Sequence, residues 1–363
     1  GHFRAGRRAE PGPAATLGEG MKIGLVGYQG SGKTALFEWL TGVAADPALA
    51  HTSQSAMAPV PEPRVELLSQ IYHPKKITLA ALELVDTPGL SRTHEGNPAR
   101  LGLIREAGCL VLVVAAFGGS DPLADLAGFR EDLLLADMEI VSGRIGRLRE
   151  SVKKPRPNRD QELAELAALE RVLQSLEAGH PLTADKMSEE EVKATRSFRL
   201  MWEKPMLVVV NAADNDEQIE RFDRVATASE PRMLAVRVGL ERELARMDES
   251  DRAEFEREMG LSGSRRDAVL RAILDASDQM LYFTAGEKEV RTWMLRQGGT
   301  ALEAADNVHS DLARGFIRAE TMQVDDLVRL GSEREVKAAH LVRQEPKDYI
   351  VRDGDILNIK FSV

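Results

Sequence analysis

The eight residues from Gly27 to Thr34 read G-x-x-x-x-G-K-T, a spacing suited to binding phosphate. Glycine lets the backbone approach a ligand closely, so the N–H groups of such a loop can surround phosphate oxygens. Lys33 would reach the β- and γ-phosphates of a nucleotide, and Thr34 would offer its hydroxyl to Mg²⁺. The residues of this loop that we expect to contact the nucleotide are Gly27, Gly30, Ser31, Gly32, Lys33, Thr34 and Ala35.

A magnesium site also requires an acidic residue at the end of a neighbouring strand, and Asp86 is suitably placed. Residues 77–85 form an apolar, strand-like run before Asp86, and the sequence D-T-P-G then ends at Gly89. Asp86 can hold Mg²⁺ through a water molecule, and the Gly89 N–H can meet the γ-phosphate. Alone, D-T-P-G would be an ordinary turn, but downstream of a P-loop it indicates a switch-type NTPase rather than a small-molecule kinase.

A third pattern could recognise the base of the nucleotide. The stretch PMLVVVNAAD is typical of a buried strand and ends in Asn211, Ala212, Ala213 and Asp214. Guanine readers have N-K-x-D here, in which Asn braces the loop and Asp accepts hydrogen bonds from guanine. Ala212 removes the lysine stem that would cover the base, and a plain strand-end turn is the alternative. The last expected nucleotide contacts end the strand-like stretch RMLAVRVG and are Val238 and Gly239.

These motifs need strands that end at one edge of a sheet. MKIGLV precedes the P-loop as a short apolar strand, and TALFEWLTG follows it with helical spacing that stops at Gly42. Three nucleotide elements at three strand ends imply a parallel α/β sheet with the ligand at its carboxyl edge. We expect the strands to follow in the order P-loop strand, Asp86 strand, 110–117, 206–210 and RMLAVRVG.

The segment between residues 114 and 206 is longer than one crossover connection needs. Two stretches within it place apolar residues at alternating spacings of three and four, as in paired helices, and Pro155 and Pro157 separate them. We therefore predict an antiparallel helical hairpin, a coiled-coil domain over 127–200 inserted in the sheet domain. The apolar positions are Leu134, Met138, Val141, Ile145, Leu148 and Val152 in the first stretch and Leu166, Leu169, Leu173 and Leu176 in the second.

The tip of this hairpin is basic. Seven cations are accompanied by a single acidic residue, Glu150, before Asp160. Such a patch on an acidic protein indicates contact with RNA or the ribosome, and a solvated turn is the alternative. The cations are Arg144, Arg147, Arg149, Lys153, Lys154, Arg156 and Arg159.

The sequence pattern changes to short strands and turns near residue 280. KDYIVRDGDILNIKFSV reads as a strand, a D-G-D turn and a second strand. Residues 280–363 therefore fit a compact α+β module, in which we find no catalytic constellation. The P-loop NTPase domain would then comprise residues 21–126 and 201–279, on either side of the insertion.

Composition excludes several classes of protein. No apolar run among the 363 residues is long enough for a membrane span, and the net charge of −10 opposes a chain-wide nucleic-acid surface. We therefore expect neither membrane nor DNA as a partner. One cysteine, Cys109, rules out a disulfide framework and favours a reducing compartment, and seven scattered histidines give no zinc site. Residues 1–20 do not resemble a secretion signal, and we expect an N-terminal extension or an expression remnant.

In the last third, the sequence resembles the YchF/Obg-like ATPase family, P-loop NTPases with a C-terminal TGS domain. YFTAGEKEVRTWM, GFIRAE and KDYIVRDGD are similar to that TGS domain, a β-grasp module, and APVPEPRVELL and LLLADMEIV are also family-like. The resemblance covers nearly the whole chain from Met21. It implies a cytoplasmic protein that hydrolyses ATP in preference to GTP. It also implies ribosome binding, for which we expect the basic hairpin tip and the TGS domain to be the contacts.

Several positions depart from the family pattern. The family has Asn at Gly30, His at Leu112, and N-x-x-E where this chain has Asp214. The family's switch I threonine motif has no clear match in this chain. Of Thr52, Ser53 and Ser55, we take Thr52 as the candidate for an additional Mg²⁺ ligand. These changes predict a divergent member with an altered nucleotide pocket.

Leu90 occupies the position at which Ras-like switches have a Gln that orients the attacking water. A leucine side chain forms no hydrogen bonds, so catalysis would depend on charge stabilisation by Lys33, the loop N–H groups and Mg²⁺. We therefore predict slow intrinsic hydrolysis that needs a partner, with Leu90 either closing over the site or simply buried. The leading function is an ATP-dependent switch. The alternatives are a GTP-specific GTPase that uses Asp214, a hydrolase of a free small substrate, and a ribosome- or RNA-binding module with a decayed NTPase.

Overall fold

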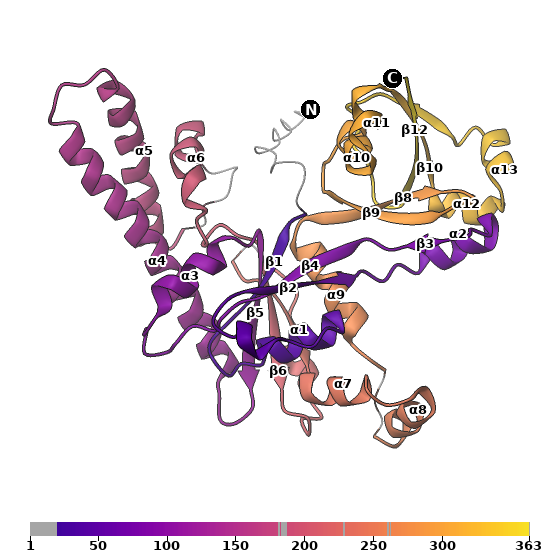
Figure 1. Cartoon of the computed structure of the whole chain (residues 1–363), viewed down its shortest axis with the longest axis horizontal. Helices are drawn as coiled ribbons and strands as arrows, with labels where there is room; N and C mark the ends of the chain where they lie inside the picture. Colours follow the sequence, from indigo (N-terminus) through magenta and orange to yellow (C-terminus); the bar gives the residue numbers. More distant parts are fainter. Residues whose placement is uncertain are drawn as a thin grey trace, which may run out of the picture.

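The computed structural model describes residues 20–180, 182, 187–227, 229–259, 261 and 263–362 (Figure 1). The expected N-terminal extension, residues 1–20, lies outside the described residues apart from Gly20. A central sheet occupies the middle of the molecule, a long helical hairpin projects from one side, and a second sheet lies on the other side.

The central sheet contains six strands, which are β1 Lys22–Val26, β2 Gln54–Pro59, β4 Ala81–Asp86, β5 Cys109–Ala116, β6 Met206–Ala212 and β7 Arg232–Val236. Their order across the sheet is β2-β4-β1-β5-β6-β7. The five neighbouring strands β4, β1, β5, β6 and β7 are parallel, which confirms the predicted parallel α/β sheet. The sequence does not predict the edge strand β2, which runs antiparallel to β4.

Helices cover both faces of the central sheet. On one face, α1 (Lys33–Thr41) and α9 (Arg266–Ala276) form a hydrophobic core with the strands. On the other face, α3 (Asn97–Arg105) packs with the first part of α4 (Pro122–Ser151), whose Phe129 is fully buried. Burial on both faces explains why the strands are apolar along nearly their whole length. The other helices of this region are α6 Glu189–Thr195, α7 Val238–Leu244 and α8 Glu249–Glu258, with 3₁₀ turns at Pro47–Leu49, Arg196–Phe198 and Ile219–Phe222.

The predicted helical hairpin is formed by α4 and α5 (Arg159–Glu177), with Pro155 in the connection between them (Figure 1). Leu148 of α4 and Leu176 of α5 belong to one buried apolar cluster along the hairpin. The expected start of this domain, residue 127, falls inside α4. The helix runs without a break from the core of the central sheet into the hairpin.

The second sheet has the order β11-β10-β12-β8-β9-β3. Its strands are β3 Ile77–Thr78, β8 Gln279–Ala285, β9 Val290–Arg296, β10 Phe316–Gln323, β11 Arg343–Glu345 and β12 Asp355–Phe361. The helices in this half are α2 Arg64–Tyr72, α10 Ala301–Val308, α11 Ser310–Arg314, α12 Val324–Leu330 and α13 Glu333–Ala338. All but β3 and α2 come from the predicted C-terminal module.

Residues 77–85 do not form the single strand that their apolar run predicts. β3 pairs with β9 of the second sheet, whereas β4 pairs with β1 of the central sheet. Between them, the Ala80 N–H donates to Thr292 Oγ1 at 2.7 Å, and just upstream α2 buries Leu68 in one cluster with Phe283. Because both sheets bury apolar side chains, hydropathy alone does not reveal where the chain passes from one sheet to the other.

Glu62 connects the two sheets through a network of ion pairs around its buried carboxylate. Its carboxylate is 2% exposed, and Oε2 lies 2.7 Å from Arg64 Nη2 and 3.0 Å from Arg271 Nη2 of α9. Arg64 Nη1 also lies 2.8 Å from Asp353 in the C-terminal region. Burial acts to raise the pKa of Glu62, but hydrogen bonds from Arg64 and Arg271 outweigh it and hold the pKa below its usual value.

We expect Glu62→Gln to lower the free energy of unfolding by about 1.5–3 kcal/mol near neutral pH, the usual contribution of a charge-assisted hydrogen bond. Since folding depresses the pKa of Glu62, its stabilisation is present above the unfolded value of 4.5 and is lost as pH falls through the folded value. Urea unfolding at decreasing pH should therefore show the difference between parent and variant shrinking.

The matched control is Glu66→Gln, an exposed carboxylate four residues further along, in α2, which should change stability by less than about 0.5 kcal/mol. Equal losses for the two variants would contradict the role given to the network. So would a Glu62→Gln deficit that stays constant in acid.

Candidate functional site

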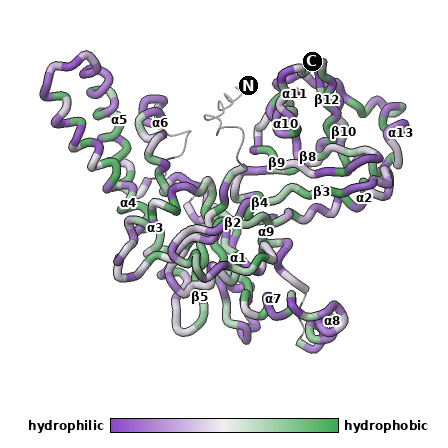
Figure 2. The backbone as a smooth tube through the Cα atoms, viewed as in Figure 1, coloured by the Kyte–Doolittle hydropathy of each residue, from purple (hydrophilic) through white to green (hydrophobic). Residues whose placement is uncertain are grey.

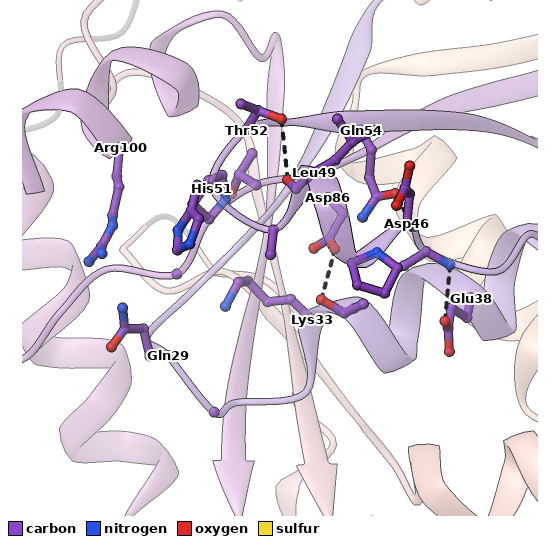
Figure 3. Close-up of a pocket in the computed structure, with 18 residues that line it drawn as sticks. Gln29, Lys33, Glu38, Asp46, Leu49, His51, Thr52, Gln54, Asp86 and Arg100 are labelled. Carbon is purple, nitrogen blue, oxygen red and sulfur yellow. Dashed lines mark hydrogen bonds between the residues drawn. The ribbon is translucent and has the colours of Figure 1, made fainter. Parts of the chain in front are cut away.

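A pocket of about 470 Å³ opens at the carboxyl ends of β1 and β4 (Figure 3). Its walls come from the P-loop, from residues 45–54, from the turn after β4 and from Arg100 of α3. The predicted residues Gly30, Lys33 and Thr34 line it. Asp86, Gly89 and Thr52 line it as well. The structure therefore brings these six predicted residues together around one pocket.

Glycine is required along the P-loop by the path of the backbone. Gly27 and Gly32 have φ values of 146° and 96°, a region that L side chains rarely adopt. A Cβ at Gly27 would collide with the Val113 carbonyl, and one at Gly32 with the Asn211 amide. The loop therefore reaches the N-terminus of α1 only with glycine at these two positions.

The Lys33 ammonium is buried within this loop. Its Nζ donates to the Tyr28 carbonyl at 3.0 Å. Burial lowers the pKa of Lys33 to about 8, against the opposing effect of Asp86, and the nearby Arg100 lowers it further. A Cβ at Gly89 would lie 2.6 Å from Lys33 Nζ, so the turn after β4 also depends on glycine. A cation held here without a carboxylate in contact is suited to binding phosphate.

Two oxygen groups beside Lys33 fit a Mg²⁺ ion. Thr34 Oγ1 donates to Asp86 Oδ2 at 2.8 Å. Burial raises the pKa of Asp86, although the Thr34 hydrogen bond and the Lys33 charge oppose the rise. Among the described residues, buried Asp86 Oδ1 and Ser31 Oγ have no hydrogen-bond partner. A hydroxyl and a carboxylate are ligands that Mg²⁺ accepts together with phosphate and water. The described residues contain no cluster of three or more His, Cys, Asp or Glu that could hold a metal by itself.

The predicted base-recognition residues lie outside this pocket but are connected to it. Asn211 Nδ2 donates to the Ser31 carbonyl at 3.1 Å, and its Oδ1 accepts from the Val238 N–H at 3.3 Å. Asn211 therefore braces the P-loop against the start of α7, as predicted for a bracing residue. Ala212 is buried in the core, and Ala35 packs against the opposite core.

Asp214 is exposed but already has a partner. Its Oδ1 accepts from the Leu240 N–H at 2.9 Å. A Cβ at Gly239 would lie 2.7 Å from both Asp214 carboxylate oxygens, so glycine makes this contact possible. One oxygen of the expected guanine reader is thus engaged with the backbone of α7.

Leu90 and Thr52 do not take the site-closing and metal-binding positions considered for them. Leu90 does not line the pocket. It is fully buried in the α3 side of the core, and its backbone bonds to Gly27 and Gln29 at 3.0 Å. The structure therefore matches the simpler expectation, a buried residue. Thr52 lines the pocket, but its hydroxyl donates to the Leu49 carbonyl at 3.2 Å instead of facing Asp86 (Figure 3).

The sequence prediction missed several polar side chains that line the pocket, namely Gln29, Glu38, Asp46, His51, Gln54, Thr87 and Arg100. Gln29 occupies a variable position of the P-loop pattern. His51 and Arg100 belong to no motif, and only the fold brings them beside Lys33. No spacing signal in the sequence would have identified these two.

The basic tip of the hairpin is largely hydrophilic (Figure 2), but more of its charge is paired with acidic side chains than the sequence suggests. Arg144 pairs with Glu165 and Arg149 with Glu170, each at 2.8 Å, and Lys153 pairs with Glu150 at 2.6 Å. The expectation of seven uncompensated cations was therefore wrong for these three, because α5 brings Glu165 and Glu170 alongside α4 and Glu150 pairs with Lys153. Within the described part of the chain, the tip cations whose side chains form no hydrogen bond or ion pair are Arg147, Lys154 and Arg156.

No helix in the described ranges combines the length and apolar character needed to cross a membrane.

The strand order, the glycine loop before α1 and the acidic end of β4 define the P-loop NTPase class of fold. Residues 280–362 match the YchF-GTPase_C family model, described as "Protein of unknown function (DUF933)". The chain is 32% identical over 366 residues to "Ribosome-binding ATPase YchF" of Haemophilus influenzae, with 95% of this chain and all of the relative covered. It is 31% identical to the protein of that name in Bacillus subtilis, with 94% and 100% covered.

A solved structure supports the same assignment. "Structure of the Schizosaccharomyces pombe YchF GTPase" superimposes with a TM-score of 0.78 at 26% identity, covering 94% of this chain and 98% of that one. The chain belongs to the YchF family, which confirms the resemblance noted from its motifs.

We expect Lys33→Ala to weaken nucleoside triphosphate binding by about 10- to 100-fold, because the variant loses a charge-assisted contact to phosphate. The fold should persist, since Lys33 is a buried charge and not an apolar core residue. Calorimetric titration measures the affinity, and Lys193→Ala on α6 is an exposed control. Parent-like affinity in Lys33→Ala, with an unchanged unfolding midpoint, would reject the assignment of this loop.

Proposed function

We propose that this protein is a nucleotide-operated switch that binds ATP with Mg²⁺, hydrolyses it slowly and associates with ribosomes. The observation that supports it most strongly is the convergence of Lys33, Thr34 and Asp86 on one pocket. Lys33 would hold the β- and γ-phosphates, while Thr34 and Asp86 would hold Mg²⁺. The ion would neutralise the charge that develops on the phosphates. Association with ribosomes would place the protein in the cytoplasm.

ATP is our proposed nucleotide. Relatives are named ribosome-binding ATPases, and Ala212 provides no lysine stem to cover a guanine. The Asp214 oxygen that accepts from the Leu240 N–H is also less available to guanine. GTP is the second candidate, because Asp214 is the carboxylate typical of guanine readers and the neighbouring solved structure is named a GTPase.

Titration calorimetry with ATP and with GTP, each with Mg²⁺, tests this preference. We expect a lower Kd for ATP. A Kd for GTP that is tenfold lower, equivalent to about 1.4 kcal/mol, would reverse the assignment in favour of GTP. Asp214→Ala separates the two cases, since it should weaken GTP binding more than ATP binding only if this carboxylate reads guanine.

Slow hydrolysis follows from the surroundings of the pocket. Leu90 cannot orient water and is buried away from the lining, and the chain has Leu112 where the family pattern has His. Positioning and charge stabilisation therefore remain as the main catalytic contributions. A ribosome or another partner would supply the acceleration.

We propose that the hairpin tip contributes to ribosome or RNA binding, together with the C-terminal TGS-like module. Arg147, Lys154 and Arg156 are the tip cations that support this, because no described carboxylate neutralises them. Cations of this kind bind phosphate backbones by releasing counterions, so binding should weaken as the salt concentration rises.

We expect Lys154→Glu combined with Arg156→Glu to reduce ribosome co-sedimentation. The slope of log affinity against log salt concentration should become shallower by about two, one for each lost phosphate contact. Nucleotide affinity should not change, since the tip lies far from the pocket in the fold (Figure 1). Arg246→Glu combined with Arg257→Glu, two exposed cations near α8, is the control. Binding that resists both the tip variant and salt would place the contact elsewhere, with the C-terminal module as the next candidate.

A further inference from the structure

The pocket is chemically asymmetric. Figure 3 shows Asp86, Glu38 and Asp46 toward one end, and Lys33, Gln29, His51 and Arg100 gathered at the other. The proposed Mg²⁺ ligand Asp86 lies at the acidic end. The side chains at the basic end would therefore face the side of a bound phosphate that points away from the ion.

Arg100 is half-buried on α3 and its guanidinium is anchored at two points. Its Nη1 donates to the Glu95 carbonyl at 3.3 Å. When the Gln29 amide oxygen faces it, both Nη1 and Nη2 lie 3.2 Å from that oxygen. No carboxylate among the described residues forms a salt bridge with Arg100. The side chain is thus held in the pocket by neutral groups, and no described carboxylate pairs with its guanidinium.

Arg100 and Lys33 line the same pocket. Both side chains lie toward the same end of it (Figure 3), and the charge of Arg100 is one of the causes that lower the pKa of Lys33. Two buried or half-buried cations that face each other are unfavourable unless an anion lies between them. A terminal phosphate bound to Lys33 would be such an anion. Gln29, in the P-loop itself, connects the guanidinium to the loop that would hold this phosphate.

We propose that Arg100 is a catalytic residue supplied by the chain itself, which contacts the γ-phosphate and stabilises the charge of the transition state. This inference rests on the proposed function. In the reaction, the oxygen of water forms a bond to the γ-phosphorus as the bond to the bridging oxygen breaks. The bonding electrons go to the β-phosphate of ADP, and a water proton goes to the released phosphate. Negative charge grows on oxygens that a planar guanidinium binds through two N–H groups.

This role fits the rest of the site. Leu90 provides no polar group that could orient the attacking water. A cation fixed at the γ-phosphate would therefore account for the slow intrinsic hydrolysis of ATP. A lysine in place of Arg100 would keep the charge but lose the two-pronged geometry.

The test compares the whole protein with Arg100→Ala, Arg100→Lys and the exposed control Arg246→Ala. We expect single-turnover ATP hydrolysis by Arg100→Ala to fall on the order of 10²-fold, and by Arg100→Lys to fall between that and the parent. ADP affinity should stay within about twofold of the parent, because the contact is to the γ-phosphate. Capture of ADP with aluminium fluoride, which resembles the transition state, should weaken in parallel with the rate.

Hydrolysis by Arg100→Ala within about threefold of Arg246→Ala would overturn the inference, and so would a rate loss matched by an equal loss of ADP affinity. The Lys33→Ala variant distinguishes this failure from failure of the proposed function. If the parent hydrolyses ATP, Lys33→Ala does not and Arg100→Ala does, only the role of Arg100 is wrong. If the parent binds no nucleotide, both proposals are wrong.

Discussion

The surroundings of the nucleotide-site candidate depend on one buried ammonium group, that of Lys33 in the P-loop. Lys33 loses water on entering the P-loop, and burial lowers its pKa to about 8, so the loop holds a cation that phosphate would stabilise. The ammonium requires glycine at position 89, while glycine at positions 27 and 32 lets the loop that holds it pass Val113 and Asn211. Strands β1, β4 and β6 must also end together, because Lys33, Asp86 and Asn211 follow from three of them. The apolar, parallel centre of the sheet keeps those ends in register.

The pocket and the C-terminal half are joined by one continuous stretch of chain. Residues 45–54 line the pocket, β2 follows at the edge of the central sheet, and α2 and β3 then become part of the second sheet. Glu62 fastens this stretch to α9 and, through Arg64, to Asp353. A change in the loop at residues 45–54 would therefore act directly on an element packed in the C-terminal core. Such a connection suits a nucleotide-operated switch, in which binding at one site must alter a distant surface.

Local spacing determined which parts of the molecule could be predicted. The P-loop, Asp86 and the helical hairpin follow from patterns within short stretches, and the structure brings Lys33, Thr34 and Asp86 together as expected. Contacts between distant stretches were not predictable. The run at 77–85 is apolar in both sheets, so its division between β3 and β4 is set by pairing with β9. The acidic partners of the hairpin tip come from α5, and Arg100 reaches the pocket only because α3 packs beside β1.

The most direct test is single-turnover hydrolysis of ATP by the isolated protein with Mg²⁺, measured without and with ribosomes. A slow switch should hydrolyse ATP at well below about 1 s⁻¹ alone and accelerate when ribosomes are added. Hydrolysis at about 1 s⁻¹ or faster by the isolated protein would show that the pocket already contains a complete catalytic apparatus. A slow rate that ribosomes leave unchanged would contradict the switch itself.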